Sequence, residues 1–352
     1  MNKDELTLLN IGDNLDTLMN LDPRGYGVCR ILYEGSRKYA GEPLSVHCAR
    51  GVIDHAKAGE KVFILTGFVL PPWNEAETDG IISSTVFAHF LIKAFAAKPV
   101  MIVPEQCVKA IEKMSKVLGF EISDSLDDFG ENTVCVIPFT KDIELAEKQA
   151  DEILSHGKPS FVFSNEAPGS NKNGYYHNAT GVNTTEIEPK YDVLFKKCRE
   201  EGIFCISIGD LGNEIGMATI EDHIREYIPY AELGGCKAGT GYGILADTTA
   251  DCLLTATVSD WGCNAIMAAI SFMLGKTELF HSADIQSAVM DAAASAGMLD
   301  MYGEARPYID GIGKNIVLPM ISMMKALIEY PPTVADKTQL WFEKTISKGF
   351  YK

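Results

Sequence analysis

The sequence lacks the features that would assign it to several specialised classes of protein. No apolar run is long enough to cross a membrane, and the first five residues do not resemble a signal peptide. There is no Walker A motif, no G-x-G-x-x-G fingerprint, no G-x-S-x-G elbow and no C-x-x-C pair. We therefore expect a cytoplasmic protein without a bound nucleotide, and a Ser-His-Asp hydrolase has no support.

Basic residues are also scarce. The chain has 31 Lys and Arg against 48 Asp and Glu, which gives a formal net charge of −17. A surface this negative repels phosphate backbones and anionic lipids, so neither nucleic acid nor a membrane is an expected partner. The acidity leaves open a site lined by carboxylates.

Soft metal ligands are not clustered in the sequence. Seven His occur without an H-E-x-x-H or H-x-H pattern, which argues against a zinc site. The nine Cys are odd in number and scattered, as expected for buried thiols in a reducing compartment. If a metal binds, carboxylate and amide oxygens must dominate, which favours a divalent Mg²⁺ or Mn²⁺.

What the chain does contain is an ordinary globular composition, with 46% hydrophobic residues over 352 positions. No repeat or linker interrupts it, so we expect one α/β domain over residues 1–352. Short β-branched runs alternate with helix-like segments. The expected strands are 61–66, 99–103, 133–137, 159–163, 203–208 and 252–258. The expected helices are 84–96, 105–118, 142–155, 191–201, 263–274, 283–296 and 314–329. This alternation predicts a doubly wound, mainly parallel sheet with helices on both faces.

Polar residues follow the expected strands where each strand ends. Asp79 lies in the loop after the first strand, Glu166 after the fourth and Asp210 after the fifth. Ligands of such folds bind beyond the carboxyl ends of the strands, so these loops predict a shared polar site. Each acid taken alone is more often a turn residue or a helix cap, and that alternative stays open.

The segment 208–217 carries the most chemistry. Three glycines allow sharp bending and close approach to a ligand, while Asp210, Asn213 and Glu214 supply two carboxylates and an amide. The alternative is a glycine-rich turn in which Asp210 caps a helix.

These residues resemble the D-glutamate cyclase family. Residues 208–217, Ile-Gly-Asp-Leu-Gly-Asn-Glu-Ile-Gly-Met, are similar to the family's I-G-D-G-G-N-E-I-G-M segment. Shorter likenesses occur in residues 22–25, 77–80, 166–169, 258–262 and 309–311. The resemblance covers about residues 20 to 315. Two departures are Asp260, where the family has Asn, and Ala167, where it has Arg.

The resemblance implies a lyase, specifically a hydro-lyase, that cyclises D-glutamate to 5-oxo-D-proline with loss of water. It implies the cyclase-like domain alone, without the separate N-terminal domain of mitochondrial relatives. Such a reaction needs a general base for the amine, and an acid or a metal ion for the departing oxygen.

The residues expected to serve this chemistry fall into three groups. The candidate catalytic residues are Asp210, Glu214, Asp79 and Glu166, of which Asp210 and Glu214 are also candidate ligands of Mn²⁺ or Mg²⁺. The candidate substrate-binding residues are Arg24, Thr66, Gly67, Thr78, Gly80, Gly212, Asn213, Ser259 and Asn264. Arg24 would clamp a carboxylate, although a plain surface Arg is an equal alternative.

Two other functions stay open. One is a lyase or hydrolase acting on another small amino acid or a lactam at the same site. The other is a non-catalytic module that binds an amino acid. In each case the partner is a small molecule, and a homo-oligomer is left open.

Overall fold

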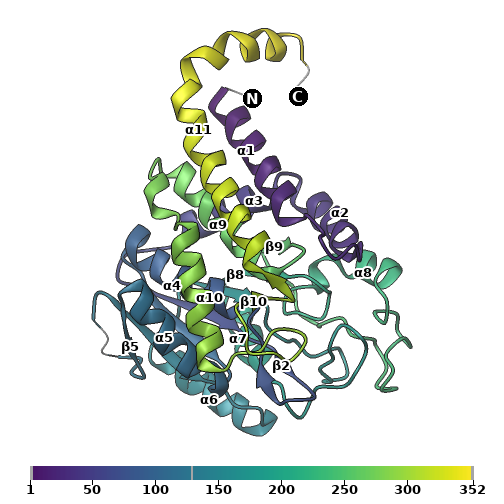
Figure 1. Ribbon diagram of the computed structural model, residues 1–352. Coiled ribbons are helices and arrows are strands. Elements are labelled where there is room, and N and C mark those ends of the chain that lie inside the picture. The colour runs from purple at the N-terminus through teal and green to yellow at the C-terminus, as the bar shows by residue number, and fades with distance from the viewer. Residues whose placement is uncertain (1–2, 128–129, 350–352) are drawn as a thin grey trace.

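A seven-stranded parallel sheet organises the computed structural model, which describes residues 3–127 and 130–349, apart from the side chains of 334–342 (Figure 1). Its order is β5-β6-β4-β1-β7-β8-β9, and every neighbouring pair is parallel. The strands are β1 (Lys61–Thr66), β4 (Lys98–Val103), β5 (Glu121–Ser123), β6 (Thr133–Pro138), β7 (Phe161–Asn165), β8 (Phe204–Gly209) and β9 (Cys252–Thr255). The predicted doubly wound fold is confirmed.

Both faces of the sheet are buried, which explains why its strands are apolar at successive positions. In β1, Val62 and Ile64 point into one hydrophobic cluster, whereas Phe63 and Leu65 point into another. The first face is covered by α3 (Leu44–His55), α4 (Ile81–Phe95), α5 (Val108–Leu118) and α9 (Ser259–Met273). The second face is covered by α6 (Ile143–Ser155) and α7 (Tyr191–Glu200).

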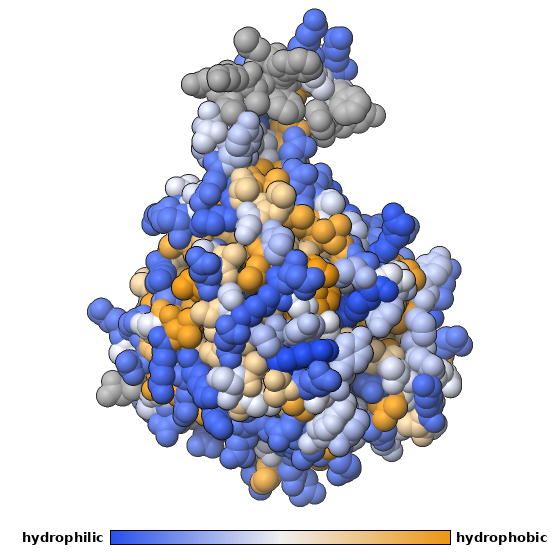
Figure 2. Space-filling view, in the orientation of Figure 1, coloured by the Kyte–Doolittle hydropathy of each residue, from blue (hydrophilic) through white to orange (hydrophobic). Residues whose placement is uncertain are grey.

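A further layer of helices lies outside the first face. Helix α1 (Lys3–Met19) and helix α11 (Lys314–Ser347) run side by side over α9, and α10 (Ala283–Ala296) packs on α5 and α11. In Figure 1, α11 (yellow) extends well beyond the sheet. Figure 2 shows hydrophilic and hydrophobic residues interspersed over this face of the rounded body. No helix among the described residues is long and apolar enough to span a membrane.

Smaller elements complete the fold. Helices α2 (Val28–Ala40) and α8 (Glu221–Tyr227) pack together near the β9 edge. Two hairpins, β2 (Val69–Leu70) with β3 (Glu75–Ala76) and β10 (Tyr308–Ile309) with β11 (Ile312–Gly313), lie outside the main sheet.

The sequence-based prediction located six of the seven sheet strands and missed several other elements. It missed α1, α2 and α3, together with the three-residue edge strand β5. It also began two helices late, since α4 starts at Ile81 and α9 at Ser259. Both early starts matter, because the first turns of these helices carry the polar residues of the site.

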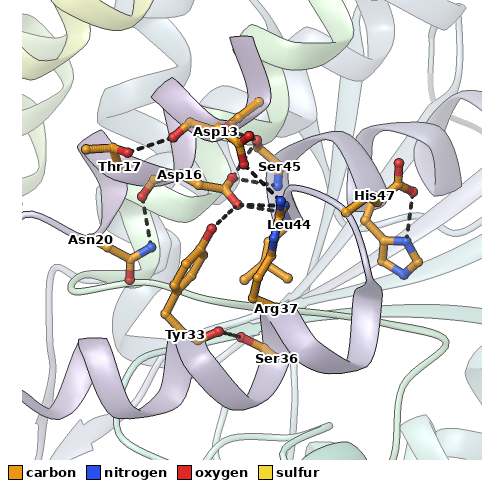
Figure 3. Close-up of polar contacts among 12 residues, drawn as sticks. Asp13, Asp16, Thr17, Asn20, Tyr33, Ser36, Arg37, Leu44, Ser45 and His47 are labelled. Atoms are coloured by element: carbon orange, nitrogen blue, oxygen red, sulfur yellow. Dashed lines mark hydrogen bonds and ion pairs between the residues drawn. The ribbon is translucent and has the colours of Figure 1, made fainter. Parts of the chain in front are cut away.

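The first three helices are joined by one buried carboxylate, Asp16 of α1 (Figure 3). Its oxygens accept the N–H of Leu44 at 2.7 Å and the N–H of Ser45 at 3.0 Å, the first two residues of α3. They also accept the hydroxyl of Ser45 at 2.7 Å and that of Tyr33 in α2 at 2.9 Å. A residue of one helix thus caps a second helix and anchors a third.

Asp16→Asn is expected to lower the free energy of unfolding by about 1–3 kcal/mol, because its amide NH₂ would face buried N–H groups. Urea denaturation followed by circular dichroism measures the loss. Asp13→Asn is the matched control on the same helix. The Asp13 side chain is 54% exposed and binds Arg37 at 2.9 Å, so we expect a change within about 0.5 kcal/mol. Equal losses in the two variants would contradict the capping role.

Candidate functional site

The candidate site lies at the carboxyl ends of the central strands, where the order of the sheet reverses. The chain runs outward from β1 through β4 and then returns to place β7 on the other side of β1. Thr66, the last residue of β1, pairs with Asn165 of β7, and Asn165 pairs with Ile208 of β8. This reversal point is where doubly wound folds bind ligands.

Two aspartates at this edge cap one another's helices. Asp79, just before α4, accepts the N–H groups of Ser259 at 3.1 Å and Asp260 at 2.8 Å, the first residues of α9. Asp260 in turn accepts the N–H of Ser83 in α4 at 2.8 Å. Both side chains are buried. The exchange fixes the starts of α4 and α9 side by side, with their positive dipole ends at the site.

Burial affects both carboxyl groups of this exchange. It raises the pKa of Asp79 to about 6, although three backbone N–H donors act to lower it. It raises the pKa of Asp260 well above its ordinary value, and the charge of Asp79 adds to this. The donors hold the pair in place without fully offsetting the cost of two buried charges.

The Glu214 side chain holds its own loop in place through backbone hydrogen bonds. Its two oxygens accept the successive N–H groups of Asp210 at 2.9 Å, Leu211 at 2.7 Å and Gly212 at 2.7 Å. Three consecutive N–H groups form a small anion-binding nest, here filled by a side chain from the same segment. A Cβ on Gly209 would lie 2.7 Å from Cδ of Glu214, so only glycine fits there. This arrangement assigns Glu214 to holding the loop.

The Asp210 carboxyl group has fewer hydrogen-bond partners than that of Glu214. The side chain is 3% exposed, and its Oδ1 atom has no hydrogen-bond partner. Burial raises the pKa of Asp210 well above its ordinary value, and the charges of Asp310 and Glu214 raise it further. A carboxyl group in this setting holds its proton more tightly than an exposed one, and a bound cation would favour release of that proton.

Glu166 is the second buried carboxyl group of the site with few hydrogen-bond partners. Its Oε2 accepts the Ser259 hydroxyl at 2.5 Å, and burial together with the charge of Asp210 raises its pKa well above the ordinary value. Its backbone φ is +48°, a left-handed conformation that is costly for a residue with a Cβ. The glycine at position 80 makes room for it, since a Cβ there would lie 2.5 Å from the Cβ of Glu166.

Arg24 supplies positive charge to this group of acids. One of its nitrogens binds the Asp310 carboxylate, and another donates to the Thr257 carbonyl at 2.6 Å. Its side chain is only 14% exposed, so the alternative of a plain surface Arg does not hold. Burial raises the pKa of Asp310 to about 7, against the lowering effect of Arg24. Asp310 also has a left-handed φ of +48°.

The acids converge closely enough to hold a metal ion. Oxygen atoms of Asp79, Asp210 and Asp310 lie within 4.8 Å of one another, as do those of Glu166, Asp210 and Glu214. Two unit charges at that separation repel by roughly 3 kcal/mol at an effective dielectric constant of about 20. Asp210 belongs to both groups. The cluster is therefore held together by retained protons, by Arg24 or by a bound cation.

The remaining predicted residues line or support the same edge. The Thr66 hydroxyl lies near Gly80, and the hydroxyls of Thr66 and Thr78 are buried without a partner. Gly67 donates its N–H to the Glu166 carbonyl at 2.9 Å, and Gly212 lies in the Glu214 nest. The Asn213 amide donates to the His177 carbonyl at 3.0 Å. Asn264 is buried in α9 with both side-chain polar atoms unpaired.

Three acidic residues of the site were not among the predicted site residues. Asp310 lies in the hairpin between β10 and β11, so the search of strand ends could not find it; the Ile309-Asp310-Gly311 likeness was the available signal. Asp260 was treated as a departure from a motif, and its role as the cap of α4 depends on a contact between distant segments. Glu77 has a pKa raised well above the ordinary value by burial and by the charge of Asp310.

Fold and site together define an α/β protein with a buried acidic centre at the reversal point of a doubly wound sheet. Residues 15–325 match the family described as "D-glutamate cyclase-like, C-terminal", and the chain belongs to this family. It is 25% identical over 267 residues to the mitochondrial D-glutamate cyclase of Homo sapiens. That match covers 73% of this chain but only 38% of the human protein.

The two acids of the 208–217 segment are expected to respond oppositely to loss of charge. Glu214→Gln turns an NH₂ group toward buried N–H donors and should lower the free energy of unfolding by about 1–3 kcal/mol. Asp210→Asn removes a carboxyl group whose ionised form is disfavoured in the fold, so stability should hold or rise. Chemical denaturation of both variants at pH 7.5 tests this. A larger loss in Asp210→Asn would contradict these roles.

Proposed function

We propose that this protein is an enzyme, a hydro-lyase that cyclises D-glutamate to 5-oxo-D-proline. The observation that carries the proposal is the pair Asp210 and Glu166, two buried carboxyl groups with raised pKa values. The positive charge of the half-buried Arg24 acts on Asp210. Membership of the D-glutamate cyclase-like family supports it. The substrate is an inference from the family name and from the chemistry of the site.

The reaction joins two groups of one molecule. The α-amine nitrogen bonds to the γ-carboxyl carbon, a C–O bond of that carboxyl group breaks, and the oxygen leaves as water. Because the nucleophile is tethered, holding the substrate in a ring-like conformer removes much of the entropic barrier. The amine must lose a proton, and the departing oxygen must gain one.

Asp210 and Glu166 are suited to this proton transfer. A carboxyl group that retains its proton near neutral pH donates it to the leaving oxygen, and a neighbouring carboxylate accepts one from the ammonium group. The Ser259 hydroxyl, bound to Glu166 at 2.5 Å, fixes the orientation of that carboxyl group. Asp79 and Glu214 are less suited, because their oxygens are committed to backbone N–H groups.

Arg24 would bind the substrate α-carboxylate. In the structure this guanidinium is engaged by Asp310, so a substrate carboxylate would take the place of the Asp310 side chain. The Nε atom of Arg24 is buried without a partner, which leaves a donor for a second carboxylate oxygen. A bound dicarboxylate would thereby be held at one end and left free to cyclise at the other.

The residues also fit a hard divalent cation, Mn²⁺ or Mg²⁺. Asp210 would hold it together with Asp79 and Asp310 or with Glu166 and Glu214, and the unpaired Oδ1 of Asp210 is an available oxygen ligand. Such an ion would supply Lewis-acid polarisation of the γ-carboxyl group. No nucleotide is proposed.

The decisive experiment incubates purified protein with D-glutamate or L-glutamate and follows 5-oxoproline by NMR and chiral chromatography. We expect product from D-glutamate, and Asp210→Asn should reduce the rate on the order of 10²–10⁴-fold. The variant should retain its folded state, as shown by the denaturation measurements. A near-normal rate in the folded variant would remove Asp210 from the chemistry.

Metal binding is expected to stabilise the fold through Asp210. Mn²⁺ or Mg²⁺ at 100 times its dissociation constant should add about 2.7 kcal/mol to the free energy of unfolding. Thermal melts with and without the ion measure the shift, which should be lost in Asp210→Asn. Glu147→Gln is the control, because the Glu147 side chain is 60% exposed on α6. An equal shift in all three proteins would show that the ion binds elsewhere.

One observation favours a different substrate. Position 167 is a fully buried Ala, so this residue supplies no cation next to Glu166 where the resemblance places an arginine. A smaller amino acid or a lactam, processed by a lyase or hydrolase reaction at the same site, is the second candidate.

Calorimetric titration of the folded protein with glutamate would separate the cases, since binding without turnover indicates a binding module. Binding of neither enantiomer favours the different substrate.

A further inference from the structure

A second cluster of reactive side chains lies far along the sheet from the acidic centre, at the start of β9. Cys252 is the first residue of β9, whereas the acidic centre lies beyond the carboxyl ends of the strands. Helix α3 packs across this point. His47, Cys48 and Gly51 all lie on the part of α3 near Cys252. The Cys252 sulfur is 3.9 Å from the His47 carbonyl oxygen and 3.2 Å from where a Cβ on Gly51 would be.

His47, whose backbone carbonyl contacts this sulfur, has its imidazole held by a carboxylate. Its Nδ1 atom lies 3.3 Å from Oε1 of Glu42, which fixes the orientation of the ring. Its Nε2 atom is buried and has no conventional hydrogen-bond partner. Glu42 is itself held by Arg50 at 3.3 Å. A carboxylate and an imidazole thus lie on the segment that contacts the thiol, and a protonated imidazole near a cysteine favours its thiolate form.

The second thiol, Cys48, is the residue after His47 on α3. Cys48 is fully buried, and Cys252 is 4% exposed. The Cys48 thiol, acting as a hydrogen-bond donor, and then His47 lower the pKa of Cys252 to about 6, although burial opposes them. Burial and the neighbouring Cys252 raise the pKa of Cys48 well above the ordinary value. The two thiols therefore differ in acidity, with the pKa of Cys252 lowered and that of Cys48 raised.

We propose that Cys252 is a site of oxidation by hydroperoxides and that Cys48 is its resolving partner, so that oxidation links α3 to β9 by a disulfide. The inference concerns thiol chemistry away from the acidic centre and does not depend on the proposed lyase activity. The oxidant is hydrogen peroxide or another small hydroperoxide.

The reaction balances in two steps. The Cys252 thiolate attacks one peroxide oxygen, the O–O bond breaks, and the hydroxide released takes a proton from the His47 imidazolium to leave as water. Cys252 is then a sulfenic acid. The Cys48 sulfur attacks the Cys252 sulfur, the S–O bond breaks, and the hydroxide leaves as water with the Cys48 proton. Two thiols are oxidised and one peroxide is reduced to two waters.

A small oxidant would reach the Cys252 sulfur from solvent beside His47. The His47 side chain is 24% exposed and that of Glu42 is 26% exposed, so the edge of this cluster reaches solvent. Hydrogen peroxide is little larger than water, and bulkier reagents would be excluded by the packing around Cys252.

The chain contains a matched control pair. Cys198 in α7 and Cys205 in β8 are both buried, and the charge of Cys205 acts on Cys198. Burial raises the pKa of Cys205 to about 12, and that of Cys198 is raised as well. These thiols are neighbours without being thiolates. If proximity alone were sufficient, this pair would oxidise as readily as Cys48 and Cys252.

The test treats the folded, reduced protein with a few equivalents of hydrogen peroxide, blocks remaining thiols in denaturant and maps the peptides by mass spectrometry. We expect a Cys48–Cys252 cross-link that dithiothreitol reverses, with Cys198 and Cys205 left as free thiols. Absence of the cross-link, or a Cys198–Cys205 cross-link formed at the same rate, would overturn the proposal.

Variants assign the steps. Cys48→Ser should leave Cys252 as a sulfenic acid that a dimedone probe labels, whereas Cys252→Ser should leave Cys48 unlabelled. His47→Asn should slow the oxidation roughly tenfold, since a cysteine with an ordinary pKa is mostly protonated at pH 7. His55→Asn on the same helix is the control and should not change the rate. Circular dichroism confirms that each variant is folded, and an unchanged rate in His47→Asn would overturn the role of His47.

Discussion

The central constraint on this protein is the burial of several negative charges at one edge of a sheet. Water cannot solvate them there, so each carboxyl group must find N–H donors, a cation or a proton. The parallel fold supplies donors, because the helices that follow β1 and β9 both start at this edge. Asp79 caps the first turn of α9, and Asp260 caps the first turn of α4. The pairing also fixes Ser259, whose hydroxyl donates to Glu166 at 2.5 Å.

The distribution of donors separates structural from chemical roles. Glu214 receives three backbone N–H groups and is satisfied as an anion within its own loop. Asp210 retains an unpaired oxygen, and Glu166 is engaged by a single hydroxyl. Because a free-energy cost accompanies each unsatisfied buried group, the last two are the groups that a substrate or an ion would relieve.

Much of the fold could be predicted because strands that are buried on both faces are apolar at successive positions. Runs such as Val62–Leu65 are apolar throughout, which is typical of parallel strands, and six of seven were found. Helices α1 and α3 were missed because they pack mainly against other helices, where the pattern of apolar residues is less regular. The placement of Asp79, Glu166 and Asp210 after strand ends also predicted that they share one edge of the sheet. It could not reveal Asp310 or the capping by Asp260, since both depend on contacts between segments far apart in the chain.

The β9 segment leads to a different kind of site at each of its ends. Its carboxyl side leads into Ser259 and the first turn of α9, where backbone donors favour anions. Its amino side begins at Cys252, where a thiol and an imidazole favour a thiolate instead. Helix α3 contacts this amino side and is itself capped by Asp16 of α1. The N-terminal helices, which sequence patterns did not identify, thus position the thiol cluster, while the strand-end loops position the acids. The two sites are thus joined through β9, although the side chains that surround them come from different segments.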